Sequence, residues 1–232
     1  MMDLQILMPA HNEESNIKEI LYNVDKAIKK MKINYSFIIC EDGSTDQTLL
    51  ILKNLKNKLK LNIFSKKNKQ GYSNAIISGM KMVKSKYLMI MDSDGQCDFN
   101  EIIKFWKNRD NADIINGNRN PRKDFLYRRF YSKLALIIYR LFFNIKLKDP
   151  SFAFILMKYK VCKSLCNFTP LMRDGFFWEF NARAKKKSFS FYEIDIKHKK
   201  RKYGNTKIFH LYQLPIITIR NLIGLLKLRF SI

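Results

Sequence analysis

The chain has 232 residues, and its 44 Lys and Arg outnumber its 20 Asp and Glu, which leaves a formal net charge of +24. A hydrophobic content of 47% supplies a core for one or two ordinary domains and excludes a disordered or collagen-like chain. No charge-free apolar run reaches the roughly 18 residues of a membrane-spanning helix, so a bundle of such helices is excluded as well.

The first half of the chain alternates short apolar runs with segments of helical periodicity. The runs at 4–9 and 35–40 predict buried strands, and the helical spacing of apolar residues over 13–32 predicts a helix between them. The alternation continues with predicted helices at 49–55, 72–84 and 100–106 and predicted strands at 61–64, 87–91 and 113–116. This order predicts an α/β fold with a doubly wound, mostly parallel sheet flanked by helices.

Two basic segments with helical periodicity follow, at 125–148 and 207–232. In the first, an apolar face is predicted from Phe130, Leu134, Ile137, Ile138, Leu141 and Ile145. In the second, it is predicted from Leu211, Leu214, Ile217, Ile219, Leu222, Ile223 and Leu226. Such amphipathic C-terminal helices either lie on a membrane or pack on the core with basic outer faces.

The net charge indicates a polyanionic neighbour such as nucleic acid, anionic lipid or a phosphate-rich substrate, unless the lysines form only a solvated coat. The chain starts without a basic segment ahead of an apolar stretch, so no secretory signal is expected. Its four cysteines form no Cys-x-x-Cys pair, which favours a reduced, cytoplasmic protein.

Acidic side chains follow three of the predicted strands directly, at the edge of the sheet where such folds bind ligands. They are Glu13, Glu41, Asp42, Asp92 and Asp94. Concentrated negative charge in a basic chain predicts a site for a metal or a hydroxyl-rich ligand. Asp92 and Asp94, with the amide oxygen of Gln96, have the spacing with which Mg²⁺ or Mn²⁺ is held on a diphosphate.

Four motifs stand in the first hundred residues: Pro9-Ala10-His11-Asn12-Glu13-Glu14, Glu41-Asp42-Gly43-Ser44-Thr45-Asp46-Gln47-Thr48, Asn68-x-x-Gly71 with Ala75 and Gly79, and Asp92-Ser93-Asp94-Gly95-Gln96. In order and spacing they resemble the family 2 glycosyltransferases of GT-A fold, and within these the dolichyl- and polyprenyl-phosphate sugar synthases. Later matches are Gly117-Asn118-Arg119, Arg122, Asp124, Arg128-Arg129, Ser132, Asp149, Glu179, Arg201 and Gly204-Asn205-Thr206-Lys207. The resemblance implies a GT-A domain over 1–207, with a nucleotide-binding half at about 1–118, an acceptor half at about 119–207, and an amphipathic helix at 208–232.

The resemblance also implies roles for the matching residues. Binding of a nucleotide-sugar donor is expected of Pro9, Ala10, Asn12, Glu13, Asp42 and Asp92. Binding of Mg²⁺ or Mn²⁺ is expected of Asp92, Asp94 and Gln96. A catalytic role, in which the metal and the basic residues offset charge on the leaving nucleoside diphosphate, is expected of Asp94, Arg119, Arg128, Arg201 and Lys207.

Two acceptor chemistries remain open. An ionised phosphate attacks without a general base, whereas a sugar hydroxyl needs one, and Asp174 or Glu179 would then be the candidates. After Asp149, the segment 152–155 lacks the glycine and the basic residue that related proteins have there, which leaves the acceptor side less defined than the donor side.

We therefore expect a metal-dependent, inverting enzyme that moves a sugar from a nucleotide diphosphate sugar to a dolichyl or undecaprenyl phosphate. We expect it to act at the cytoplasmic face of a membrane, bound peripherally to anionic lipid. The alternative is a glycosyltransferase that extends a saccharide in cell-surface glycan synthesis. A basic nucleic-acid-binding protein is a remote alternative that leaves the acidic strand ends unexplained, so no nucleic-acid partner is expected.

Overall fold

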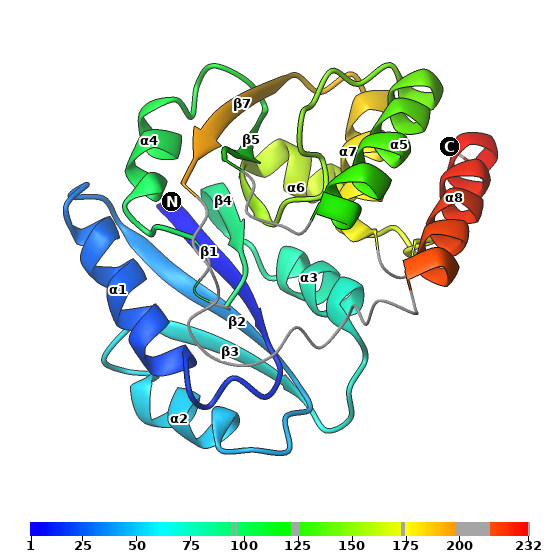
Figure 1. The fold of residues 1–232 in the computed structure, drawn as a ribbon. Helices are drawn as coiled ribbons and strands as arrows, with labels where there is room; N and C mark the ends of the chain where they lie inside the picture. Colours follow the sequence, from blue (N-terminus) through cyan, green and yellow to red (C-terminus); the bar gives the residue numbers. More distant parts are fainter. Residues whose placement is uncertain (94, 96, 122–125, 173–174, 198–213, 232) are drawn as a thin grey trace.

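A computed structural model describes residues 1–93, Gly95, 97–121, 126–172, 175–197 and 214–231, and of residues 126–131, 214–215 and 217–218 it describes the backbone alone. Its centre is a seven-stranded sheet with the strand order β3-β2-β1-β4-β6-β5-β7 (Figure 1). The neighbouring strands pair in parallel except where β6 pairs antiparallel with both β4 and β5. The predicted α/β fold with a mostly parallel sheet is confirmed.

The strands of the first half are β1 (Met2–Ala10), β2 (Tyr35–Asp42), β3 (Leu61–Lys66), β4 (Ser85–Met91) and β5 (Ile114–Arg119). Its helices are α1 (Ile17–Lys29), α2 (Thr48–Leu55), α3 (Tyr72–Lys81) and α4 (Glu101–Lys107). Each of these elements was predicted from the sequence, and the differences are confined to their ends. Apolar runs and helical spacing thus located the elements because every one of them buries side chains against the same sheet.

The second half adds β6 (Phe154–Lys158), β7 (Phe191–Ile196), α5 (Leu126–Phe143), α6 (Tyr159–Leu165), α7 (Phe176–Lys186) and α8 (Leu214–Ser231). The sequence analysis predicted neither β6 nor β7. Strand β6 inserts between β4 and β5, with Leu88 opposite Met157 and Ile115 opposite Leu156. The sheet therefore continues without a break across the predicted boundary at residue 118.

Two apolar layers cover the two faces of the sheet. Strand side chains alternate between the layers, so that Ile6 and Met8 pack with α1, α2 and α4, while Leu7 packs with α3, α6 and α7. The sheet is thus covered on both faces, as its continuous apolar strands require.

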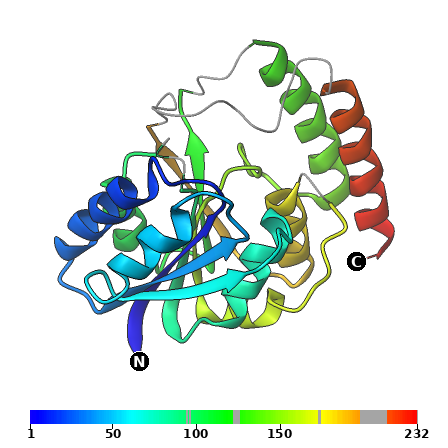
Figure 2. The ribbon, with the colours of Figure 1, turned by 90° about the horizontal axis from the view of Figure 1, so that it is seen from below.

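A third, smaller cluster joins α5, α7 and α8 through buried residues that include Tyr139, Met172 and Leu228. Helices α5 and α8 lie side by side at one edge of the molecule (Figures 1 and 2). None of the helices in the described part of the chain is long and apolar enough to cross a membrane.

Of the apolar face predicted over residues 130–145, Ile145 is buried in the cluster of α5, α7 and α8, but three other members do not pack inward. Leu134, Ile137 and Leu141 are exposed, whereas Tyr139 is fully buried against α7. The alternative in which this face packs inward with basic residues outside is therefore wrong for these three side chains.

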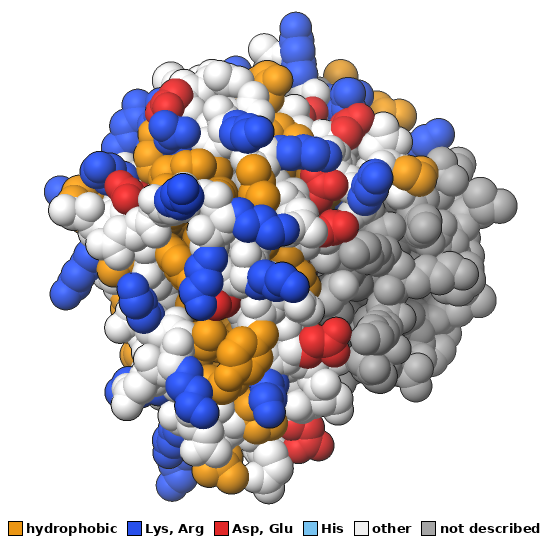
Figure 3. All heavy atoms as spheres, turned by 90° about the vertical axis from the view of Figure 1, so that its left-hand side faces the viewer, with side chains coloured by type: hydrophobic (Ala, Val, Ile, Leu, Met, Phe, Trp, Pro, Cys, Tyr) orange, Lys and Arg blue, Asp and Glu red, His pale blue; other side chains and the backbone are white. Residues whose placement is uncertain are grey.

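The side of the molecule that carries α1, α2 and α4 shows Lys and Arg side chains dispersed among other types, with Asp and Glu between them (Figure 3). No single basic patch dominates this view. On this side, the positive charge has the form of a dispersed coat.

Candidate functional site

The ends of β1 and β4 lie next to each other at the carboxyl edge of the sheet. After β1 the chain turns back to β2 on one side, and β4 pairs with β1 on the other, so the strand order reverses between them. A crevice outside such a reversal point is where open α/β sheets bind ligands. Pro9 and Ala10 end β1, His11–Glu13 follow it, and Asp92 follows β4 directly.

The turn after β1 is tied to the turn after β2 by Asn12. Its side-chain oxygen accepts from the backbone N–H of Thr45 at 2.9 Å, and its own backbone N–H donates to Ser44 Oγ at 3.0 Å. Asn12 has a φ of 54°, in the left-handed region that asparagine tolerates better than most residues. The predicted donor-binding residue thus also fixes two loops relative to each other.

The other predicted residues of this turn are similarly placed. The backbone N–H of Glu13 donates to Thr48 Oγ1 at 2.9 Å, and Glu13 Oε2 accepts from Asn16 at 3.1 Å. The carbonyl oxygen of Pro9 accepts from Ser93 Oγ at 2.9 Å, which ties the end of β1 to the segment after β4. Ala10 is buried at the end of the strand.

Asp42, at the end of β2, holds the chain that leads into α3. Its two oxygens accept from the backbone N–H groups of Gln70 at 2.7 Å and Gly71 at 2.8 Å. Gly71 has a φ of 94°, so the backbone conformation at this position favours glycine. A cavity of about 360 Å³ lies beside Asp42 and is lined by Gln70, Asn74 and Phe168 among others.

Glu41, the neighbour of Asp42, uses its carboxylate to hold its own loop. Its carboxylate is 2% exposed and accepts from the backbone N–H of Ser44 and the hydroxyl of Ser65. A glycine follows at position 43, where an added Cβ would lie 2.7 Å from the backbone nitrogen of Lys69. Of the five carboxylates predicted at this edge, Glu41 is therefore buried and supports the loop, although it also lines the cavity beside Asp42.

Asp92 is joined to the first residue of α3. The hydroxyl of Tyr72 donates to Asp92 Oδ1 at 2.7 Å, and the Tyr72 ring meets Phe177 of α7 edge to face at a centroid distance of 6.3 Å. Sequence reasoning missed Tyr72, because an aromatic residue after a glycine carries no signal of a carboxylate partner 20 residues later. Asp94 and Gln96, the other two predicted metal ligands, lie outside the described residues.

Oxygen donors alone make up the predicted metal site, and this donor set fits Mg²⁺ or Mn²⁺. Within the described part of the chain, no group of three or more His, Cys, Asp and Glu could hold a metal ion. Asp92 is the one predicted ligand whose position is described, and it stands at the carboxyl edge, hydrogen-bonded and partly exposed.

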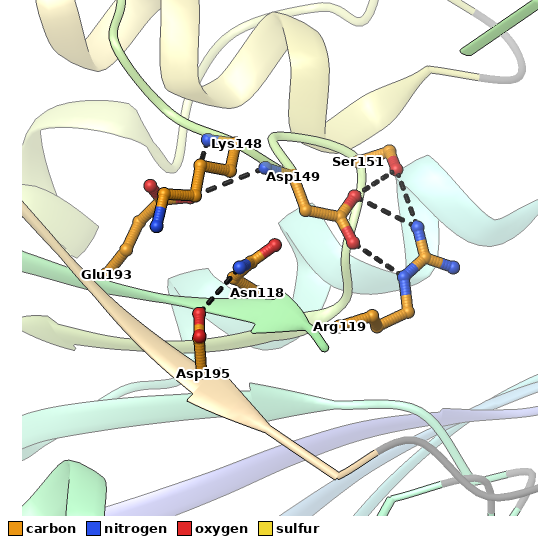
Figure 4. A network of polar contacts seen from close by, with 7 residues as sticks. All are labelled: Asn118, Arg119, Lys148, Asp149, Ser151, Glu193 and Asp195. Carbon is orange, nitrogen blue, oxygen red and sulfur yellow. Dashed lines mark hydrogen bonds and ion pairs between the residues drawn. The ribbon is translucent and has the colours of Figure 1, made fainter. Parts of the chain in front are cut away.

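Arg119, at the end of β5, is held by a nearly buried carboxylate (Figure 4). Its Nε donates to Asp149 Oδ2 at 2.6 Å and its Nη2 to Asp149 Oδ1 at 2.9 Å, with a further bond to Ser151 Oγ at 3.0 Å. The guanidinium also lies over the Phe152 ring, with its Cζ 4.9 Å from the ring centroid. These contacts fix the plane of the guanidinium, as a bidentate pair does.

Strand β7 supports the segment that carries Asp149. Glu193 accepts from the backbone N–H groups of Lys148 at 2.7 Å and Asp149 at 3.3 Å, and burial raises the pKa of Glu193 (Figure 4). Asp195 accepts from Asn120 and Asn118, and these hydrogen bonds lower its pKa. Both acidic residues were missed because the sequence predicted no strand at 191–196.

Next to this pair lies a cavity of about 210 Å³ between α5, α7 and the segment 148–151. Its lining includes Ser132, Lys133, Lys148, Asp149 and Trp178. The two lysines and two serines of the lining suit a phosphate or another anion, because the carboxylate of Asp149 there is paired with Arg119.

Glu179, a candidate general base, is fully buried in α7. Its Oε2 accepts from the backbone N–H groups of Leu171 and Met172 at 2.8 Å each, and its Oε1 pairs with Arg183 at 2.7 Å. Both oxygens are thus engaged in holding the segment before α7. The other candidate, Asp174, lies outside the described residues.

We expect Glu179→Gln to lower the free energy of unfolding by about 3 kcal/mol, because Arg183 loses its counter-charge. The new NH₂ group also faces either Arg183 or the N–H groups of Leu171 and Met172, which share one acceptor oxygen. Urea unfolding measures this loss. Turnover of the protein that remains folded is expected to keep the wild-type pH profile. Glu19→Gln, an exposed position in the first turn of α1, serves as control. Unchanged stability with lost turnover would instead identify Glu179 as a base.

Of the remaining predicted catalytic residues, Arg128 lies in α5 with its side chain undescribed, and Arg201 and Lys207 lie outside the described residues. The structure thus brings Asn12, Glu13, Asp42 and Asp92 to one edge of the sheet. Arg119 is the last residue of β5, which lies on the far side of β6 in the same sheet.

Comparison with known proteins gives a family match over residues 5–180, to the family described as Glycosyl transferase family 2. Among curated proteins, the chain is 23% identical over 216 residues to an undecaprenyl-phosphate 4-deoxy-4-formamido-L-arabinose transferase of Pseudomonas fluorescens strain Pf0-1. The protein of that name from Shewanella sediminis is 26% identical over 216 residues. Each alignment covers 88% of this chain and 59% or 61% of the relative, so the chain spans about three fifths of their length.

Among solved structures, glucosyl-3-phosphoglycerate synthase from Mycobacterium tuberculosis, in complex with Mn²⁺, UDP-glucose and phosphoglyceric acid, superposes with a TM-score of 0.73 at 13% identity. The match covers 98% of this chain and 80% of that one. Mannosyl-3-phosphoglycerate synthase from Rubrobacter xylanophilus gives a TM-score of 0.72 at 8% identity, over 97% of this chain and 73% of that one. At such identities the likeness concerns the fold, which is the one predicted from the motifs.

Proposed function

Because the chain belongs to glycosyl transferase family 2, we propose that it transfers a sugar from a nucleoside diphosphate sugar to a polyprenyl phosphate. The observation that carries this proposal is the alignment of 88% of the chain with transferases named for undecaprenyl phosphate. The lysine-lined cavity beside Asp149 supports it, since a phosphate acceptor needs positive charge where it binds.

The donor is proposed to bind at the carboxyl edge, where Pro9, Ala10, Asn12, Glu13 and Asp42 shape the place for base and ribose. Carboxylate and amide oxygens there accept from ribose hydroxyls and ring N–H groups. The backbone contacts of Asn12 and Asp42 support this role, because they pre-position the loops before the ligand arrives.

Asp92, Asp94 and Gln96 are proposed to hold Mg²⁺ or Mn²⁺ on the diphosphate. When bound, the cation offsets negative charge on the leaving nucleoside diphosphate. Structural neighbours have been crystallised with Mn²⁺ or Mg²⁺ together with UDP. Asp94 is proposed to act in catalysis through this same cation, which it helps to hold where it offsets the charge of the leaving diphosphate.

Positive side chains are proposed to share the phosphate charge: Arg119, Arg128, Arg201 and Lys207. Arg119 enters this role with its guanidinium already oriented by Asp149, so little side-chain entropy is lost when a phosphate binds. The acceptor half at about 119–207 would then reach into the sheet of the nucleotide-binding half at about 1–118, because its strand β6 lies between β4 and β5.

In the proposed reaction, an oxygen of the ionised acceptor phosphate attacks the anomeric carbon from the side opposite the leaving diphosphate. The bond from that carbon to the diphosphate oxygen breaks with its electron pair on the diphosphate, so the configuration inverts. No proton has to leave a phosphate whose second pKa is near 6, which removes the need for a base. The internal contacts of Glu179 are consistent with this requirement.

The test is an assay of the purified protein with Mn²⁺, a panel of nucleotide sugars, and either a polyprenyl phosphate or oligosaccharides. We expect a lipid-linked sugar monophosphate whose formation requires the metal. Transfer to a saccharide with none to any lipid phosphate would replace the proposal by the saccharide-extending alternative. Because the proposed acceptor has a lipid tail, the reaction is proposed to take place at a membrane; the cytoplasmic face and peripheral binding of the protein belong to the same proposal.

Tyr72 is expected to orient Asp92 toward the cation. Tyr72→Phe removes one hydroxyl, and we expect the Mn²⁺ dissociation constant to rise roughly tenfold, the usual cost of losing a hydrogen bond that orients a metal ligand. Electron paramagnetic resonance of Mn²⁺ measures this without turnover. The matched control is Tyr87→Phe, whose hydroxyl donates to Asp110. An equal effect of both variants would refute the role.

A further inference from the structure

Helix α8 is apolar on two sides. Leu225 and Leu228 are buried in the cluster with α5 and α7, at 1% and 0% exposure. On its other side a second stripe of apolar side chains is exposed by 45–84%: Ile216, Ile219, Ile223, Leu226 and Phe230. Their spacing of three and four residues keeps them on one face of a helix, over a length of about 21 Å.

Helix α5, which packs beside α8, adds a shorter stripe of the same kind. Leu134, Ile137 and Leu141 are exposed by 44%, 57% and 77% and are likewise three and four residues apart. We call these eight side chains the α5–α8 surface. Large apolar side chains gathered at helical spacing on adjacent helices are unlike the single exposed residues of ordinary surfaces and mark an interaction site.

The charges of the two helices indicate which kind of partner fits the α5–α8 surface. Residues 126–143 and 214–231 contain no Asp or Glu, but four Lys or Arg in the first range and three in the second. A second copy of the chain would bring like charges together, which disfavours self-association. A surface of exposed Leu, Ile and Phe with basic residues beside it fits an interface that is apolar inside and anionic at its rim, and a bilayer with anionic headgroups has this structure.

We propose that the α5–α8 surface docks on an anionic lipid bilayer, with both helices lying in the interface plane. The proposal rests on the proposed function for the presence of a membrane, and it deepens that function by assigning the surface and the orientation. None of the described helices can span a bilayer, so the docking is interfacial.

The orientation follows from the two sides of α5. Ser132, Lys133 and Leu136 line the cavity beside Asp149, while Leu134, Ile137 and Leu141 point to the exposed side of the helix. The cavity and the exposed stripe thus lie on different sides of α5. Docking holds the cavity within reach of a phosphate at headgroup depth, and the prenyl tail can stay in the bilayer.

The test places an environment-sensitive nitrobenzoxadiazole label on single cysteines, Leu141→Cys and Ile223→Cys, in a Cys166→Ser background of the full chain. Cys166 is the one described cysteine that is not buried. With vesicles of phosphatidylcholine and phosphatidylglycerol, both labels are expected to shift to the blue with a several-fold rise in emission. Leu50→Cys, on α2 and 55% exposed, is the control that should not respond. A response at Leu50 equal to that at the two test positions, or none at either, overturns the proposal.

A second variant separates docking from catalysis. Ile223→Glu is expected to lower the vesicle partition coefficient roughly tenfold or more, whereas Leu50→Glu leaves it unchanged. Transfer to a short-chain, water-soluble polyprenyl phosphate should be equal in both variants and the wild type. Loss of vesicle binding is measured without substrate, so it stands even if no transfer is found and the proposed function fails. A dimer by sedimentation that Ile223→Glu dissociates, with no vesicle binding by the wild type, would assign the surface to a second copy.

Discussion

Asp92→Asn is expected to lower kcat/KM for sugar transfer on the order of 100-fold or more, while the fold stays intact. The substitution removes one negative charge from the proposed cation site and keeps the size of the side chain. A metal that stabilises the leaving diphosphate contributes several kcal/mol of transition-state stabilisation, so weaker metal binding raises the activation free energy. Single-turnover kinetics at saturating and limiting Mn²⁺ measure the effect, and circular dichroism checks the fold.

The matched control is Asp110→Asn, because Asp110 also accepts a hydrogen bond from a tyrosine hydroxyl, that of Tyr87. Asp110 lies before β5 and no metal role is proposed for it. Its replacement should leave turnover and Mn²⁺ affinity unchanged. Near-wild-type activity and Mn²⁺ binding of Asp92→Asn would overturn the proposed metal site and leave the family assignment untouched.

Asp149→Asn is expected to lower the free energy of unfolding by about 3–5 kcal/mol, the usual cost of breaking a buried ion pair from one side. Asp149 is 4% exposed, and the guanidinium of Arg119 would keep its burial but lose its counter-charge. Transfer should also fall, because Arg119 would lose the orientation that the bidentate pair gives it. Urea unfolding and turnover, measured where the variant is fully folded, separate the two effects.

A double variant makes this prediction sharper. Arg119→Met with Asp149→Leu replaces the pair by apolar side chains and is expected to recover much of the stability, as apolar replacement of a buried pair often does. It should not recover transfer if Arg119 binds phosphate. The surface pair of Lys86 with Asp3 is the control, and Asp3→Asn should cost less than about 1 kcal/mol. Recovery of transfer in the double variant would reduce Arg119 to a structural role.

How much of the site could be predicted depended on whether a residue acts through its sequence neighbours or through distant ones. The positions of Asn12, Asp42 and Asp92 after strands follow from local patterns, since each strand is an apolar run that ends at a polar residue. The partners of these residues could not be predicted in the same way. Tyr72 meets Asp92, and Glu193 supports Asp149, only because separate segments are folded together.

The sequence by itself determined the α/β class, the strands and helices of the first half, and the family, because apolar runs, helical spacing and motif order are local properties. The tertiary structure alone decided that β6 runs antiparallel between β4 and β5, since strand pairing depends on where the chain returns. It also decided which segment each carboxylate holds. Glu41 and Asp42 are neighbours that line the same cavity, yet Glu41 accepts from Ser44 and Ser65 next to it in the sheet and loop, while Asp42 holds Gln70 and Gly71 ahead of α3. For α8, apolar on both sides, only packing against α5 and α7 shows which stripe faces outward.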